Sequence, residues 1–271
     1  MILPVVAELL GRVGRHPAAE GALAALRRGE PVVHLAGLTE PARALLVAHV
    51  ALALERPVLW LVGSNAVAEM SLEPLRFFYR ALSGRATNEV QILPALDVLP
   101  YEGRSPHAEI CEARAVALWR LASGAARIVL APVAAAQMRL READYFRSRA
   151  LVLARDMEIP LEMLLEHLHG TGYARRELVE APGQFAVRGG IVDVFSPEAV
   201  RPVRIELLGD TVESLREFDP ATQRSVARLE RAVLLPLSEF PHTARVVERV
   251  WAAAGGAATP GEADLADALP G

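Results

Sequence analysis

Residues 183–195 read GQFAVRGGIVDVF, and residues 202–218 read PVRIELLGDTVESLREF. In both stretches apolar and polar residues alternate, which is the pattern of β-strands with one buried face. A two-residue turn sequence interrupts each stretch, Gly189–Gly190 in the first and Gly209–Asp210 in the second. Such turns connect neighbouring antiparallel strands. The sequence therefore predicts two successive hairpins, with strands over 185–188, 191–195, 203–208 and 211–218.

A different pattern occupies the residues before 140. Apolar runs of strand length alternate there with amphipathic segments of helix length, which favours an α/β layer with a parallel sheet. The predicted strands are Val32–Leu35, Val58–Val62, Val90–Leu93 and Ile128–Ala131. The clearest helix is predicted to begin with Ser105 as its N-cap and Pro106 as its first residue, and to end near Gly124.

The change of pattern divides the chain into three predicted parts. An α/β domain is expected over 1–138, and a small α+β antiparallel domain, with one helix near 160–169, over 139–228. The remainder, 229–271, contains a strand-like run at Ala232–Leu237 and a helix-like run at Thr243–Ala254. From Gly255 onward the sequence loses its periodicity, as in a linker or a broken-off end.

The composition excludes several classes of protein. All 29 residues counted as Lys plus Arg are arginines, and the formal net charge is -4. Without lysine the chain cannot form a Schiff base or an intact phosphate-binding P-loop. No apolar run reaches the ~18 residues of a membrane span, and the single Cys111 has no disulfide partner in the chain. We therefore expect a cytoplasmic protein with no membrane association.

Residues 37–44 lie where a phosphate-binding loop would lie, between a predicted strand and the following helix. Gly37 matches the first glycine of such a loop. The other key positions are occupied by Glu40, Ala42, Arg43 and Ala44. Glu40 would place a carboxylate beside a bound phosphate. Ala42, Arg43 and Ala44 replace the second glycine, the lysine and the magnesium-binding hydroxyl, in that order. A like-charge contact at ~4 Å costs about 4 kcal/mol at an effective dielectric of ~20. We interpret the segment as a decayed, non-functional nucleotide site; an ordinary strand-to-helix turn is the alternative.

Several motifs follow one another in a characteristic order. They are LPYEGRSPH at 99–107 with Glu109 and Arg114 beyond it, Gly172–Tyr173, PGQFAVRGGIVDVF at 182–195, PVRIELLGD at 202–210, REFD at 216–219 and TQRS at 222–225. In this order the motifs resemble the amino-terminal region of the bacterial transcription-repair coupling factor family. They resemble the corresponding part of the excinuclease subunit UvrB more distantly. The similarity extends from about Gly37 to about Phe240.

This resemblance implies a fold and distinguishes the two relatives. The fold is a parallel-sheet, degenerate helicase-like layer, similar to UvrB domains 1a and 1b, into which a small antiparallel domain of the UvrA-binding type is inserted. UvrB keeps a working P-loop and a long aromatic hairpin. Here the 99–107 segment is short, Tyr101 is its only tyrosine, and the loop at 37–44 has decayed. Both departures match the coupling factor.

The resemblance also implies docking residues. Arg175, Arg188, Arg204 and Glu206 match positions at which UvrB contacts the damage-recognition subunit UvrA, whereas Ala186 replaces a further arginine. Ala186 and Arg188 share a strand parity and therefore project to one face of their strand. The same holds for Arg204 and Glu206. Arginine suits polar interfaces because its planar fork binds carboxylates. The alternative is a solvated sheet face, on which Arg204 and Glu206 form a surface ion pair worth under ~1 kcal/mol.

The resemblance thus implies a non-catalytic region that recruits UvrA to RNA polymerase stalled at DNA damage. In the full-length family protein, other domains contact RNA polymerase and DNA, and an ATP-dependent motor displaces the polymerase. ATP and magnesium are expected only in that motor, so we expect no cofactor, no metal and no catalytic residue in this segment. One alternative is a divergent UvrB-like helicase subunit that still binds nucleotide. Another is DNA binding through the arginines of 139–149, which Glu142 and Asp144 interrupt.

Overall fold

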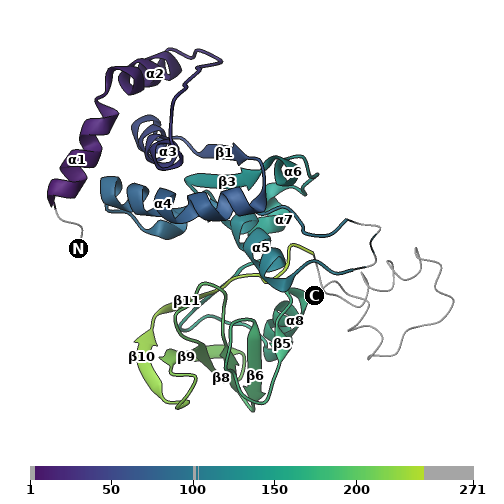
Figure 1. Ribbon diagram of the computed structural model, residues 1–271. Helices are drawn as coiled ribbons and strands as arrows, with labels where there is room; N and C mark the ends of the chain where they lie inside the picture. The colour runs from purple at the N-terminus through teal and green to yellow at the C-terminus, as the bar shows by residue number, and fades with distance from the viewer. Residues whose placement is uncertain (1–3, 100–101, 103, 241–271) are drawn as a thin grey trace. The chain divides into compact units, whose positions relative to one another are not determined.

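The computed structural model describes residues 4–99, 102 and 104–240. The chain divides into two compact units. The first comprises Met1–Ala95 and Arg120–Leu140, and the second comprises Leu96–Trp119 and Arg141–Gly271. The helices and strands of both are labelled in Figure 1. A parallel sheet, a largely antiparallel sheet and a separate antiparallel pair are present, so the expected mixed α/β architecture is confirmed.

The first unit is built around the parallel sheet, whose strand order is β1-β3-β2. Its strands are β1 (Val58–Val62), β2 (Val90–Ile92) and β3 (Ile128–Pro132). Its helices are α1 (Pro4–Gly14), α2 (Pro17–Arg27), α3 (Glu40–Leu54), α4 (Asn65–Ser83), the 3-10 helix η1 (Thr87–Glu89) and α6 (Val133–Ala136). Alanines of α3 and the buried side chains of Leu75 and Tyr79 of α4 pack against Val90 and Ile128, and form the core.

The predicted strand at Val32–Leu35 was wrong. The sheet of the first unit consists of β1, β3 and β2, and residues 32–36 form no strand. Val32 and Leu35 are 63% and 41% exposed. An apolar, β-branched run favours a strand, but a strand also requires a neighbouring backbone with which to pair, and that neighbour is set by the tertiary structure. The segment 37–44 therefore lacks the strand that a phosphate-binding loop follows.

Helix α5 (Ala108–Ala122) begins later than the sequence predicts. The His107 carbonyl accepts from the N–H groups of Ile110 and Cys111, at 3.0 and 3.1 Å, so the first turn forms at His107 and not at Ser105. The His107 N–H donates to the Asp97 carboxylate at 3.2 Å, which fixes the entry of the chain into the helix. Gly124, with a positive φ of 73°, follows the helix end as predicted.

The second unit contains the predicted hairpins. Its six-stranded sheet has the order β10-β9-β8-β7-β6-β5. The strands are β5 (Ala174–Arg175), β6 (Gln184–Arg188), β7 (Ile191–Val194), β8 (Val203–Leu208), β9 (Thr211–Phe218) and β10 (Ser225–Leu229). Positive φ values at Gly189 and Gly209 confirm the two turns. A separate antiparallel pair joins β4 (Leu151–Ala154) to β11 (Arg231–Leu234), and α7 spans Ala143–Arg147. The helix predicted at Thr243–Ala254, and Pro100, Tyr101 and Gly103 of the 99–107 motif, lie outside the described residues.

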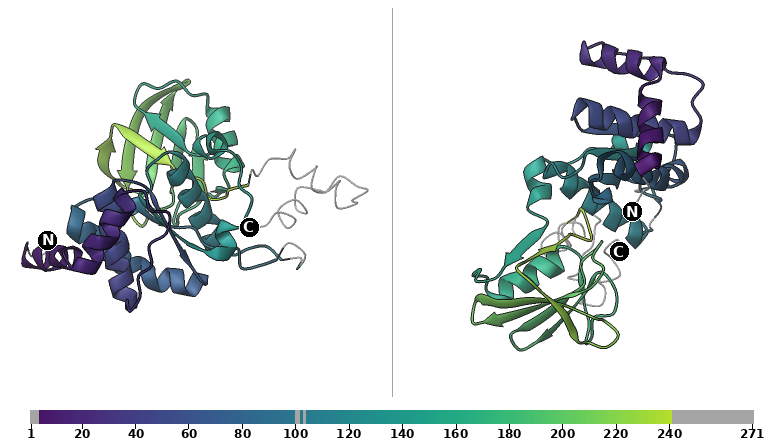
Figure 2. Two further views of the ribbon diagram at one scale, coloured as in Figure 1. Left: turned by 90° about the horizontal axis from the view of Figure 1, so that it is seen from above. Right: turned by 90° about the vertical axis from the view of Figure 1, so that its left-hand side faces the viewer.

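Helix α8 (Leu161–Gly170), predicted near 160–169, covers one face of this sheet (Figure 2). Leu164 and Leu168 of the helix pack with Phe185, Val192 and Ile205 of three neighbouring strands, and all five side chains are fully buried. The opposite face of the sheet carries the polar members of the alternating pattern. Within the described part of the chain, no helix is long and apolar enough to cross a membrane.

Replacing Gly190 by alanine is expected to destabilise the second unit. A Cβ atom at this position would lie 2.7 Å from the carbonyl oxygen of Leu207, in β8. At Gly189 a Cβ would meet open space, and the cost there comes from its φ of +60° alone. We expect a loss of about 2 kcal/mol for Gly190→Ala and about 1 kcal/mol for Gly189→Ala in urea denaturation. A larger loss at Gly189 would contradict this account of the turn.

Candidate protein-docking site

Register aligns the residues of the polar sheet face, which lies opposite α8, into two rows. Ala186 pairs with Asp193, Asp193 with Arg204, Arg204 with Arg216, and Arg216 with Arg228. The second row passes from Arg188 through Ile191 and Glu206 to Ser214. Neighbours across strands share a face of the sheet. The structure therefore brings three predicted docking residues together, namely Arg188, Arg204 and Glu206.

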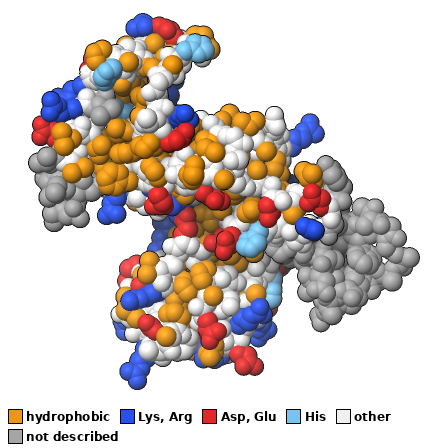
Figure 3. Space-filling model, in the orientation of Figure 1, with side chains coloured by type: hydrophobic (Ala, Val, Ile, Leu, Met, Phe, Trp, Pro, Cys, Tyr) orange, Lys and Arg blue, Asp and Glu red, His pale blue; other side chains and the backbone are white. Residues whose placement is uncertain are grey.

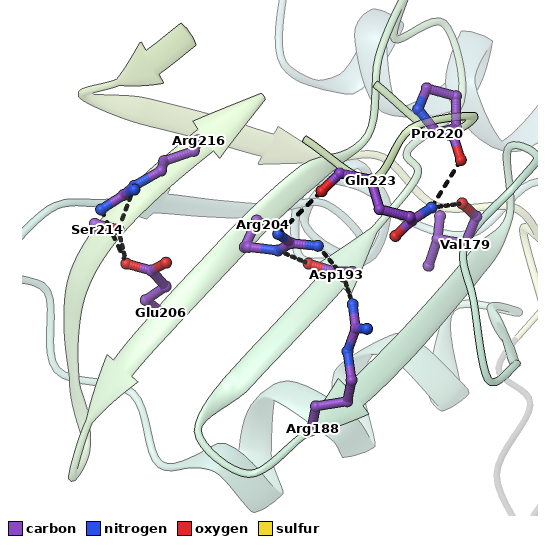
Figure 4. A network of polar contacts seen from close by, with 9 residues as sticks. All are labelled: Val179, Arg188, Asp193, Arg204, Glu206, Ser214, Arg216, Pro220 and Gln223. Atoms are coloured by element: carbon purple, nitrogen blue, oxygen red, sulfur yellow. Dashed lines mark hydrogen bonds and ion pairs between the residues drawn. The ribbon is translucent and has the colours of Figure 1, made fainter. Parts of the chain in front are cut away.

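A buried carboxylate joins two of these arginines. Asp193, only 1% exposed, accepts from Arg204 Nε at 2.7 Å and Nη2 at 2.8 Å, and from Arg188 Nη2 at 2.6 Å. The two guanidinium groups, from β6 and β8, meet at the carboxylate of β7 (Figure 4). Burial of a carboxylate is costly unless it is paired with a cation and hydrogen-bonded. The Asp193 carboxylate has two guanidinium partners, and both donate hydrogen bonds to it.

The guanidinium of Arg204 has three neighbours within the domain. Besides Asp193, its Nη1 donates to the carbonyl of Gln223 at 3.4 Å, and its Cζ lies 4.7 Å from the centre of the Phe218 ring. The hydrogen bond to Asp193 is the main cause that raises the pKa of Arg204. Its side chain is 17% exposed, against 49% for Arg188. Arg188 is therefore the more accessible cation of this pair.

Glu206 pairs with Arg216, and not with Arg204. Glu206 Oε2 lies 3.3 Å from Arg216 Nη2 and also accepts from the Ser214 hydroxyl. These residues border a surface pocket of about 220 Å³ that Arg155 and Arg228 also line. On the face of the second unit visible in Figure 3, acidic, basic and hydrophobic side chains are interspersed. Such a mixture can form ion pairs and apolar contacts with a protein partner.

Arg175 and Ala186 lie outside this cluster. Arg175 is exposed on β5 at the sheet edge, and its register partner is Phe185, which faces the core. Ala186 shares the parity of Arg188 but is buried with Val179 and Phe218. A small side chain at 186 therefore packs beneath the loop that contains Val179, and it leaves no charge at that point of the face.

Asp193 was missed by the sequence analysis. Its signal is a carboxylate in the otherwise apolar run Ile191–Phe195, at a position with the parity of the polar face. A charged residue inside such a strand is buried only when it is paired. Its partners could not be identified, because the register between strands decides which arginines lie beside it.

The predicted nucleotide loop precedes and enters α3. Gly37 has a positive φ of 76°, and Ala44 is buried. The carboxylate of Glu40, in the first turn of the helix, lies 2.8 Å from Nη1 of Arg43. The positive end of the helix dipole stabilises an acidic side chain at this position.

The arginines after residue 140 have partners within the second unit. Arg141 stacks on the Tyr145 ring at 4.4 Å, and Arg147 pairs with Asp144. Arg149 donates to the carbonyls of Gly170 and Phe240, at 2.5 and 3.1 Å. Arg141 and Arg147 remain exposed, whereas Arg149 is partly buried.

Comparison with known proteins shows which DNA-repair proteins these residues are similar to. Residues 151–240, which include the whole polar sheet face, match the family model described as the UvrB interaction domain. The chain is 35% identical to the transcription-repair-coupling factor of Myxococcus xanthus over 84% of its own length and 19% of that protein. It is 29% identical to the coupling factor of Bacillus subtilis, over 80% of the chain and 18% of that protein.

Another relative carries the UvrB name. The UvrABC system protein B of Thermus thermophilus is 30% identical, over 81% of the chain and 34% of that protein. The resemblance to the UvrB-like region of the transcription-repair coupling factors is therefore confirmed. The chain spans less than a fifth of the length of the coupling factors it matches.

Proposed function

We propose that this chain is a non-catalytic docking region that takes part in transcription-coupled DNA repair and binds UvrA. One observation carries the proposal. Arg188, Arg204 and Glu206, which the resemblance assigns to UvrA docking, lie together on one polar face within the residues that match the UvrB interaction domain.

The chemistry of this face supports a protein partner. Arg188 is half-exposed beside a fixed carboxylate, and Glu206 and Arg216 lie farther along the same face. Exposed charges of both signs can pair with complementary charges and set the orientation of a complex. UvrA, the partner implied by the resemblance, would supply those complementary groups.

The proposal also covers the domain arrangement and the partners of a full-length coupling factor that contains this chain. The domain at 139–228 would be inserted between the α/β part at 1–138 and the returning segment at 229–271. Docking of UvrA would bring repair to a stalled RNA polymerase, while other domains contact polymerase and DNA and hydrolyse ATP. Such a protein would act in the cytoplasm, where transcription occurs in bacteria.

Charge reversal on the docking face is expected to abolish capture of UvrA. Arg188→Glu places a carboxylate where the partner would supply one, so the ion pair is replaced by repulsion. In a pull-down with purified UvrA, the wild-type chain should retain UvrA, whereas Arg188→Glu and Arg204→Glu should not. Arg231→Glu, on the exposed start of β11, is the matched control. Equal retention by all variants would refute the assignment of this face.

We also propose that residues 37–44 do not bind nucleotide. The Glu40 carboxylate would repel a phosphate, and the Arg43 guanidinium is paired with that carboxylate. Titration with a fluorescent ATP analogue should show no saturable binding by the chain. Micromolar affinity that is lost on mutation of Arg43 would instead favour the helicase-subunit alternative.

A further inference from the structure

We propose that Asp193 and Arg204 are positioning residues that hold Arg188 as the contacting cation of the docking face, and that the partner supplies a carboxylate to Arg188. The proposal rests on the docking function above. It changes the role of Arg204, from a residue that touches the partner to one that acts through its neighbour.

Each of the three guanidinium nitrogens of Arg204 already donates a hydrogen bond within the domain. Nε and Nη2 bind the two oxygens of Asp193, and Nη1 faces the carbonyl of Gln223. The Phe218 ring covers one side of the guanidinium plane. A partner that drew this group away from Asp193 would break a bidentate pair with a buried carboxylate. Breaking such a pair leaves a charge buried without compensation.

Arg188 has the opposite character. In the described part of the chain, its side chain makes one polar contact, from Nη2 to Asp193 Oδ2. An arginine guanidinium has five N–H groups in a planar fork, so donors remain for a second acceptor. The side chain is 49% exposed, which leaves that part of the fork open to a partner.

The charges of the cluster determine the chemistry of the partner. One buried carboxylate faces two guanidinium groups, so the cluster of Arg188, Asp193 and Arg204 carries one uncompensated positive charge. Arg204 is largely covered, and the accessible part of that charge therefore lies on Arg188. A carboxylate that approaches Arg188 completes the charge balance and can bind through paired hydrogen bonds.

The backbone that carries Arg188 is fixed as well. Arg188 ends β6, directly before the Gly189–Gly190 turn, and the Gly190 carbonyl accepts from the Leu207 N–H at 2.8 Å. With the backbone held by this turn and the side chain held by Asp193, the guanidinium loses little freedom on binding. Reduced loss of side-chain entropy increases affinity without adding a contact.

A double-mutant cycle with purified UvrA tests this role. We expect Arg188→Gln, Asp193→Asn and Arg204→Gln each to weaken binding, Arg188→Gln by about tenfold or more. In the Arg188→Gln background, Asp193→Asn and Arg204→Gln should cause no further loss of affinity. A further loss of the full single-mutant size in that background would overturn the proposal, because Arg204 would then touch UvrA itself. Arg231→Gln is the matched control and should leave affinity unchanged.

A measurement on the chain alone separates this proposal from the docking function. The guanidinium NMR signals of Arg188 should report hindered rotation in the wild type and free rotation in Asp193→Asn. Free rotation of Arg188 in the wild type would overturn the positioning role, whether or not UvrA binds. Absence of UvrA binding by the wild-type chain would refute the docking function, and the NMR result would still decide how Arg188 is held.

Discussion

Replacing Arg114 by methionine is expected to reduce the free energy of unfolding of the second unit by about 3–5 kcal/mol. Arg114 of α5 is fully buried and forms a bidentate pair with Glu239, which is 7% exposed. Nε lies 2.5 Å from Oε1 and Nη2 lies 3.1 Å from Oε2. Removing the guanidinium leaves the Glu239 carboxylate buried without its counter-charge. Urea denaturation monitored by circular dichroism measures the loss.

Two further variants test this explanation. Arg147→Met breaks an exposed ion pair with Asp144 and should cost under about 1 kcal/mol. The double variant Arg114→Met with Glu239→Leu removes both charges and should recover much of the lost stability. If the double variant were as unstable as the sum of the two single variants, the ion pair would not be the source of the effect.

The first unit is expected to lose stability at alkaline pH through Tyr79. Its ring is 1% exposed, and its hydroxyl donates to Glu89 Oε2 at 2.5 Å. Burial, together with the hydrogen bond to Glu89, raises the pKa of Tyr79 to about 12. In the unfolded chain the pKa is about 10, so between these values the unfolded state has released a proton that the folded state retains.

The stabilising contribution is therefore present below about pH 10 and is lost as the pH rises through about 12. At pH 11 about 1.4 kcal/mol should be lost, and about 3 kcal/mol above both values. Urea midpoints at pH 8 and pH 11 measure this, with Tyr79→Phe as the control that cannot titrate. An identical pH dependence of wild type and Tyr79→Phe would contradict the prediction.

The antiparallel sheet could be predicted because its determinants are local. Alternation along β6 to β9 defines the buried face, and the turns at Gly189–Gly190 and Gly209–Asp210 join strands that are adjacent in sequence. In the parallel sheet each strand pairs with one that is distant in sequence. The run at Val32–Leu35 has the apolar composition and the length of a strand, and it still pairs with no strand of the sheet.

The sequence named candidate docking residues but not their contacts. Strand parity predicted a shared face for Arg204 and Glu206, and a shared face for Ala186 and Arg188; the register shows that Arg188 lies on the same face as Arg204 and Glu206. Neither the motif resemblance nor strand parity could show that Asp193 lies between the two arginines, because that depends on the register of β7 against both neighbours. The register also separates Arg175, whose partner in β6 faces the core.

Calorimetric titration of UvrA into the chain tests the central claim most directly. We expect saturable binding with a Kd near the micromolar range, about -8 kcal/mol. Arg188→Glu should weaken it by at least about tenfold, and Arg231→Glu should not change it. Absence of binding by the wild-type chain, or an unchanged Kd for Arg188→Glu, would contradict the assignment of the polar face of β6, β7 and β8 as the docking site.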